Sequence, residues 1–243
     1  MRVLLKIAYD GTDFCGYQVQ PNKRTVESEL KLALDGLLKE DVKLVASGRT
    51  DSGVHALSQC VHFDTQTKIP VKNLKDAINS TLPKDLRVIS SKKVSSDFSA
   101  RYSCKKKTYR YSCYLSKTEN PMLERYKTLV EYPLDIDKMK AVSKTLEGEH
   151  DFKCFLKTGS SVKTTVRTIY SIKIVKKGSS LDFYVTGNGF LYNMVRIIVG
   201  TLLAVGEGKL DEKSVATALQ TGNRALLGKT ASAKGLCLYR VNY

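Results

Sequence analysis

The pattern of apolar and polar residues in the first hundred positions predicts strands that alternate with two helices. Residues 2–9 are typical of a strand, and residues 10–20 of a glycine-containing loop, the opening loop. A helix is expected after Thr25, because apolar residues then recur at helical spacing and threonine is a good N-cap. A second helix should end before Pro83; its apolar positions are Leu74, Ile78 and Leu82. Further strands are expected at residues 42–46, 56–63 and 86–94.

The rest of the chain also predicts both strands and helices, without an obvious sequence repeat. Strands are expected at residues 108–115, 168–175, 181–186 and 236–241. Helices are expected at residues 136–146, after the N-cap Asp135, and at residues 190–205 and 214–219. The helix at 190–205 carries apolar residues on nearly every face, so it should be buried against a sheet. Because no linker rich in proline or glycine separates the two parts, they should share one sheet or a close interface.

Composition narrows the class of partner. The 243 residues carry a formal net charge of +16, from 40 Lys and Arg against 24 Asp and Glu. This excess indicates a polyanionic partner, with RNA or DNA first among the candidates, although a basic surface can also serve solubility alone. A hydrophobic content of 42% fits a soluble globular protein. No apolar run is long enough to cross a bilayer and no cleavable leader precedes the first strand, so we expect a cytoplasmic protein without membrane contact.

Basic residues cluster with tyrosines in one short segment. The basic residues are Arg101, Lys105, Lys106, Lys107 and Arg110, and the tyrosines are Tyr102, Tyr109 and Tyr111. Such a segment supplies phosphate contacts and flat surfaces for stacking, or it forms a strand edge that lysines protect from pairing. The six cysteines and three histidines are too scattered for a metal-ligand spacing, so we expect reduced thiols and no metal.

A carboxylate lies between an arginine and glycines in the segment Ser47-Gly48-Arg49-Thr50-Asp51-Ser52-Gly53-Val54-His55. Glycine permits close approach of a ligand where the chain leaves a sheet. Arg49 would favour the ionised form of Asp51, and the pair could then hold a charge where solvent is scarce. The same residues also suit a polar turn, in which Asp51 bonds its own backbone and Arg49 is solvated.

Arg196 and Tyr109, in the C-terminal part, each have both a chemical and a structural interpretation. Arg196 lies on the apolar helix, where a buried cation needs a carboxylate or phosphate partner unless it reaches the helix periphery. Asp51 is the partner that we expect. Tyr109 and Tyr111 share one face of their expected strand, which is also typical of residues that pack a sheet.

Five ordered segments carry a likeness to a known family, and Lys234-Gly235-Leu236-Cys237-Leu238 closes the match. The segments are residues 9–20, residues 48–56, residues 98–101 with 107–111, residues 150–152, and residues 189–196 with 198–200. Together they resemble the tRNA pseudouridine synthase A family over nearly the whole chain. Two positions depart from the family pattern: Tyr17 stands where tryptophan is frequent, and Ser232 stands where proline is usual.

The resemblance implies a fold and an activity. The fold is α+β, with two similarly built halves, residues 1–98 and 99–243, that share a central mixed or antiparallel sheet flanked by helices, with a basic cleft between them. The activity is the isomerisation of uridine to pseudouridine in the tRNA anticodon stem-loop, typically at positions 38, 39 and 40. A homodimer would carry it out without a cofactor.

The resemblance also implies roles for individual residues. The target base leaves its stack, and Asp51 acts as the nucleophile. Arg49 occupies the vacated space, Tyr109 stacks on the uracil, and Arg196 pairs with Asp51. From the residues alone, two other functions stay open: a non-catalytic protein that binds structured RNA, and a nuclease, which would need clustered carboxylates for a divalent metal.

Overall fold

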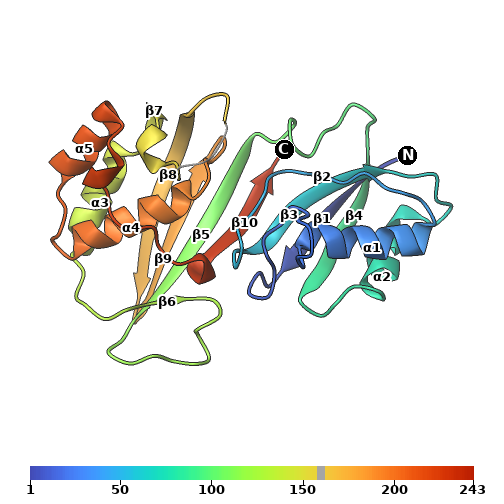
Figure 1. Cartoon of the computed structure of the whole chain (residues 1–243), viewed down its shortest axis with the longest axis horizontal. Helices are drawn as coiled ribbons and strands as arrows, with labels where there is room; N and C mark the ends of the chain where they lie inside the picture. Colours follow the sequence, from blue (N-terminus) through green and yellow to red (C-terminus); the bar gives the residue numbers. More distant parts are fainter. Residues whose placement is uncertain (158–161) are drawn as a thin grey trace. The chain divides into compact units, whose positions relative to one another are not determined.

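Two sets of elements, unit 1 and unit 2, make up the structure, a computed structural model that describes residues 1–157 and 162–243 (Figure 1). Unit 1 comprises Met1–Lys105 and Cys237–Tyr243, and unit 2 comprises Lys106–Leu236. The sequence predicts a division at residues 98 and 99 and assigns the final strand to the second half. In the structure the chain passes to unit 2 after Lys105, and the final strand joins unit 1 because it pairs with a strand there.

Unit 1 is built on a mixed sheet with the strand order β4–β1–β3–β10, and β2 pairs with β3. The strands are β1 (Arg2–Tyr9), β2 (Val45–Ala46), β3 (His55–Asp64), β4 (Leu86–Val94) and β10 (Leu236–Asn242). β10 runs parallel to β3, and the other pairs are antiparallel. Every second residue of β1 is buried, so one face of the sheet carries the core. The helices α1 (Val26–Leu38) and α2 (Val71–Asn79) contribute their apolar sides to this core (Figure 1).

Side-chain caps decide where several helices begin. The Thr25 hydroxyl accepts a hydrogen bond from the Ser28 N–H, and the Ser28 hydroxyl accepts one from the Thr25 N–H, which forms a capping box before α1. Asp135 caps α3 (Ile136–Thr145), and Asp211 caps α5 (Glu212–Thr221), each by accepting from the third backbone N–H of its helix. The predicted caps Thr25 and Asp135 are therefore confirmed.

In unit 2 the strand order is β5–β9–β8–β7, with antiparallel neighbours, and β6 pairs in parallel with β5. The strands are β5 (Lys106–Leu115), β6 (Thr128–Val130), β7 (Gly148–Asp151), β8 (Val166–Lys177) and β9 (Ser180–Gly187). The helices α3, α4 (Met194–Gly206) and α5 lie together on one face of this sheet (Figure 1). In the part of unit 2 that the structure describes, short 3₁₀ helices span Lys153–Phe155, Arg224–Leu226 and Ala233–Gly235.

The apolar helix α4 begins later than the sequence predicts. The predicted start is residue 190, but α4 begins at Met194, because Asn193 has a φ of 62°, a left-handed conformation that interrupts a helix. The predicted burial is confirmed, since side chains on most faces of α4 are buried. Within the described parts of the chain, no helix is both long and apolar enough to cross a membrane.

The other differences from the predicted elements are short. The strand predicted at residues 42–46 contains only Val45–Ala46, because the Val42 N–H donates instead to the Asp35 side chain (3.1 Å). The second helix ends at Asn79, whose side chain bonds both backbone groups of Val88 in β4 (2.8 and 2.9 Å), so Leu82 lies beyond it. β6 and β7 were not predicted. Both units combine helices with a mixed sheet, which confirms the α+β class; the basic cleft stays a prediction.

Candidate active site

The loop between β2 and β3, here the Asp51 loop, also carries Arg49. Gln59 of β3 pins its first part: the Gln59 side chain accepts a hydrogen bond from the Ser47 hydroxyl (2.6 Å) and donates one to the Gly48 carbonyl (2.7 Å). Asp51 is half-buried, whereas Arg49 is exposed. The start of the loop is therefore tied to the sheet, while the Arg49 side chain extends into solvent.

The opening loop holds the backbone on both sides of Asp51. Before Asp51, the Tyr17 N–H donates to the Thr50 carbonyl (3.0 Å). After it, the Gly53 N–H donates to the Phe14 carbonyl (3.3 Å). Because both neighbouring parts of the loop are bonded to the same segment, the backbone that carries the carboxylate has a defined position.

Two glycines allow the opening loop to lie this close to the Asp51 loop. Gly16 has a φ of +89°, and a Cβ added there would stand 3.0 Å from the Thr50 carbonyl oxygen and 3.4 Å from the Asp51 carbonyl carbon. At Gly11 an added Cβ would lie 2.1 Å from the Val54 carbonyl oxygen, a separation that no side chain can adopt. The sequence displays both glycines, but it does not show which backbone each one meets.

Buried polar contacts extend this anchoring to the start of β3. The Gly11 N–H donates to His55 Nδ1 (2.9 Å), and the Tyr9 and Thr50 hydroxyls share a hydrogen bond (2.8 Å). Buried hydrogen bonds are the ones whose loss is costly, because the partner left behind stays desolvated. The sequence analysis did not assign a role to His55 or Tyr9.

Arg24 supports the opening loop from outside. Its guanidinium carbon lies 4.2 Å from the centroid of the buried Phe14 ring, and it donates two hydrogen bonds to Asp85 (2.8 and 2.9 Å) and one to Glu29 (3.1 Å). The hydrogen bonds from Arg24 lower the pKa of Asp85 below its usual value, so the pair stays ionised at neutral pH. Through Phe14, whose carbonyl bonds Gly53, this arginine acts on the Asp51 loop; the sequence analysis missed it.

Tyr109, on β5 of unit 2, is packed in the core. It is 8% exposed, and its ring meets Phe190 edge-on with centroids 5.2 Å apart. Tyr111, two residues further along the strand, is fully buried, as expected for residues that share the packed face of a sheet. The structure thus shows the packing role that the sequence left open, and stacking on uracil stays a prediction.

Arg196, on α4 of unit 2, is half-buried and bonded to oxygen atoms of its own unit. Its Nε donates to the Ala231 carbonyl (2.7 Å), and its Nη1 donates to the side-chain oxygen of Asn193 (2.7 Å). Asn193 is the residue whose left-handed conformation precedes α4, so one residue both delays the helix and orients the guanidinium. The expected pairing of Arg196 with Asp51, a residue of unit 1, stays a prediction.

The segment that carries Ala231 is in backbone contact with α4. A Cβ added at Gly200 would lie 1.8 Å from the Lys229 carbonyl oxygen, so only glycine fits at this point of the helix. The Ala231 N–H also donates to the Arg196 carbonyl (3.1 Å). The close approach at Gly200 therefore sets the position of the carbonyl that holds the Arg196 side chain.

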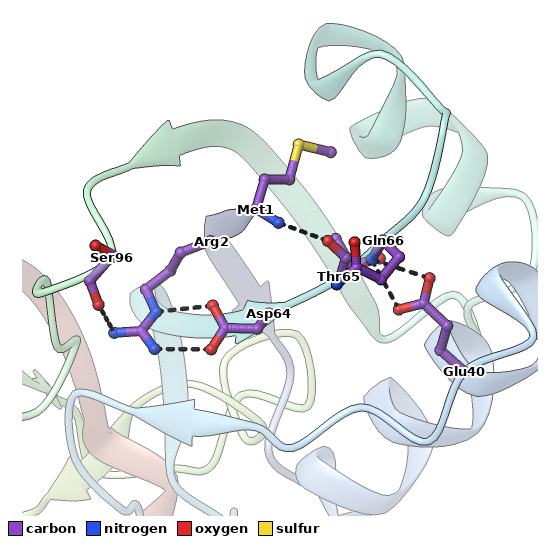
Figure 2. Close-up of a pocket in the computed structure, with 7 residues that line it drawn as sticks. All are labelled: Met1, Arg2, Glu40, Asp64, Thr65, Gln66 and Ser96. Atoms are coloured by element: carbon purple, nitrogen blue, oxygen red, sulfur yellow. Dashed lines mark hydrogen bonds and ion pairs between the residues drawn. The ribbon is translucent and has the colours of Figure 1, made fainter.

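A pocket of about 400 Å³ in unit 1 lies at the other end of the sheet from the Asp51 loop (Figure 2). It is lined by Met1, Arg2, Glu40, Asp64, Thr65, Gln66 and Ser96. Arg2 is opposite Asp64 at one end of the β1–β3 pair, whereas Tyr9 is opposite Ala56, next to the Asp51 loop, at the other end. Figure 2 shows Arg2 donating two hydrogen bonds to Asp64 (2.9 and 2.7 Å). Because these charges are already paired with each other, the pocket is not part of the candidate site.

The described residues contain no group of three or more His, Cys, Asp or Glu side chains that could hold a metal ion. All six cysteines lie in the described parts of the chain, and none of them forms a disulfide there. Burial raises the pKa of Cys113 to about 12 and that of Cys154 to about 11, so neither thiol forms a nucleophilic thiolate at neutral pH. Neither of these two buried thiols is therefore a candidate nucleophile.

Known proteins resemble the chain over nearly its full length. A family model for tRNA pseudouridine synthase matches residues 6–103 and 142–243. A tRNA pseudouridine synthase A of Halalkalibacterium halodurans is 47% identical over 242 residues, which cover 99% of this chain and 92% of that one. A tRNA pseudouridine synthase A 1 of Bacillus cereus is 46% identical over 243 residues, 100% of this chain and 98% of that one. The crystal structure of a Cbf5–Nop10–Gar1 complex matches 98% of this chain and 58% of that one, with a TM-score of 0.40 and 14% identity, too weak a likeness to add to the assignment. On the family model and these relatives, the chain belongs to the tRNA pseudouridine synthase family.

Proposed function

We propose that the protein isomerises uridine to pseudouridine in tRNA, with Asp51 as the nucleophile. Family membership supports the reaction class. One observation on this chain supports the choice of residue: the opening loop bonds the backbone before Asp51, from Tyr17 to Thr50, and the backbone after it, from Gly53 to Phe14. Such anchoring suits a carboxylate that has to meet a reacting atom in a defined geometry.

The isomerisation is redox neutral. The bond from ribose C1′ to uracil N1 breaks, the base turns, and C1′ forms a bond to C5. The C5 proton leaves and N1 gains a proton, so atoms and electrons balance. In our proposal Asp51 is the group that attacks, either at the sugar or at the base, and its ionised form is the reactive one.

We further propose that the target is a uridine of the anticodon stem-loop, at position 38, 39 or 40, and that its base leaves the stack. Extracting a base costs a few kcal/mol, which phosphate and stacking contacts have to offset. The net charge of +16 favours such phosphate contacts. Arg49, exposed and two residues before Asp51, is our candidate for occupying the vacated space.

Two residues of unit 2 complete the proposal. Arg196 pairs with Asp51 and thereby favours its ionised form. Tyr109 stacks on the extracted uracil. The support for both roles is the likeness of residues 107–111 and 189–196 to the family, together with the side chains that orient them: Asn193 for Arg196, and Phe190 for Tyr109.

The test of the nucleophile is substitution of Asp51. Asp51→Asn should lower the rate of pseudouridine formation in unmodified tRNA by about 10⁴-fold or more, measured by mass spectrometry after chemical labelling. Asp76→Asn, at an exposed aspartate on α2, is the control and should keep the wild-type rate. Undiminished product from Asp51→Asn would remove Asp51 from the mechanism.

A non-catalytic RNA-binding protein is the second candidate, because the charge and the tyrosines would serve it equally well. If the wild-type protein bound tRNA without changing its nucleoside composition, this candidate would replace the enzyme. A homodimer belongs to our proposal through the family resemblance alone, and a cytoplasmic location stays an expectation from the sequence. Sedimentation of the purified protein at several concentrations tests the dimer.

A further inference from the structure

The tyrosines of the basic segment differ sharply in exposure. Tyr109 and Tyr111 are 8% and 0% exposed, whereas Tyr102 is 81% exposed. We infer that Tyr102 and Arg101 together form a stacking platform, the Arg101–Tyr102 platform, for an unpaired base of the substrate tRNA other than the target uridine. The inference rests on the proposed function for the identity of the RNA. It assigns the platform to positioning the substrate, not to the chemical step.

The backbone beneath the platform is firmly held. Ala100, just before it, is fully buried, its N–H donates to His62 Nδ1 (3.0 Å), and its carbonyl accepts from the Tyr243 hydroxyl (3.0 Å). The Tyr102 N–H donates to the Ser99 hydroxyl (3.3 Å). Because the backbone is fixed while the Tyr102 side chain extends into solvent, a ligand would lose little affinity to ordering of the protein.

The chemistry of the platform fits a nucleotide. The Arg101 guanidinium carbon lies over the Tyr102 ring, 5.4 Å from its centroid, so the platform combines a cation with a flat aromatic ring. Lys105, shortly after them, is also exposed, and the sequence has no acidic residue between Asp97 and Glu119. An unpaired nucleotide offers a base face for the ring and a phosphate for the cations. Protein–protein interfaces are depleted of lysine, whereas the exposed Lys105 lies close to the platform in sequence.

The expected magnitude follows from stacking. Removing an aromatic ring that stacks on one base typically weakens binding of single-stranded nucleic acid by about tenfold. Loss of one phosphate contact weakens binding by less. Because the platform makes no contact with the reacting atoms in this proposal, the loss should fall on substrate binding and leave the chemical step unchanged.

The experiment compares Tyr102→Phe, which keeps the ring, with Tyr102→Leu, which removes it. Single-turnover assays with unmodified tRNA should give about a tenfold higher half-saturation concentration for Tyr102→Leu, an unchanged maximal rate, and values within twofold of wild type for Tyr102→Phe. Tyr170→Leu, at a 52% exposed tyrosine on β8, is the matched control and should behave as wild type. Thermal melts check that each variant is folded.

Several outcomes would overturn the platform. Wild-type affinity in Tyr102→Leu, or an equal loss in Tyr102→Phe, would exclude stacking. A loss of the same size on a fully paired RNA duplex, measured by filter binding, would show a backbone contact instead. A change in sedimentation with unchanged RNA affinity would identify a protein interface. If the wild-type protein made no pseudouridine, the proposed function would fail, but the filter-binding comparison of tRNA with duplex would still decide on the platform.

Discussion

Replacing Gly200 with alanine tests whether α4 and the segment at Ala231 really touch through their backbones. An added Cβ would lie 1.8 Å from the Lys229 carbonyl oxygen and 3.2 Å from the Ala231 nitrogen. The first separation is far inside van der Waals contact, and its neighbour is backbone, which cannot rotate away as a side chain would. In Gly200→Ala the segment therefore has to move outward from the helix.

Two opposing effects decide the magnitude. Alanine is favoured over glycine inside a helix by about 1 kcal/mol. Outward movement of the segment breaks three hydrogen bonds, two between Arg196 and Ala231 and one from the Gly228 N–H to the Thr201 hydroxyl (3.1 Å). At about 1 kcal/mol each, these bonds outweigh the helix preference, and the lost contacts add to them. Gly200→Ala should therefore lower the free energy of unfolding by about 2 kcal/mol or more.

The assay is urea unfolding combined with pseudouridine formation. Gly200→Ala should be less stable and should also turn over more slowly, because the Ala231 carbonyl no longer orients the Arg196 side chain. Gly36→Ala in α1 is the matched control. Gly36 is exposed, and apart from its chain neighbours and the backbone of α1, no described atom lies within 4 Å of its added Cβ, so the variant should gain up to about 1 kcal/mol. Wild-type stability in Gly200→Ala would refute the close backbone contact. Wild-type turnover would show that this contact does not orient the Arg196 side chain.

Two further substitutions test other contacts. Burial lowers the pKa of His62 below its ordinary value of 6.5, and its neutral ring accepts a hydrogen bond from the Ala100 N–H. As the pH falls, His62 therefore binds a proton in the unfolded chain before it does so in the folded protein. The free energy of unfolding should fall as the pH drops below about 6.5. An unchanged pH profile of urea melts in His62→Asn would contradict this. Asp85→Asn should lower kcat several-fold with the KM for tRNA unchanged, because Arg24 loses its bidentate partner. A change confined to the KM for tRNA would argue against a role of Arg24 in positioning the Asp51 loop.

Helices and strands whose bounds depend on residues close in sequence could be predicted. β1 and β4 have the bounds that the sequence predicts, and Thr25 caps α1, because strand patterning and capping depend on residues close in sequence. The start of α4 was not predictable. It depends on the left-handed conformation of Asn193, whose side chain accepts a hydrogen bond from Arg196, and Arg196 also donates to the carbonyl of Ala231, 35 positions away. Contacts of that range leave no period in the sequence.

The same distinction applies to the candidate site. The glycines around Asp51 marked the loop, and Arg49 was recognised beside it, but the support from Tyr17, Phe14 and Arg24 joins distant segments. In the sequence, only the glycines of the opening loop could have indicated that its backbone approaches another segment closely. The tyrosines of the basic segment look alike in sequence, and burial alone distinguishes them.

The pairing of β10 with β3 affects the order in which the protein can form during synthesis. β10 pairs in parallel at His55 and Ala56, directly after the Asp51 loop, yet it follows every residue of unit 2 along the chain. On the ribosome, unit 2 is contiguous and can fold as soon as it emerges, whereas unit 1 keeps an unfilled sheet edge beside Asp51 until β10 arrives. The nascent chain thus completes the unit that carries Asp51 last, after a period in which that edge is open to association with other chains.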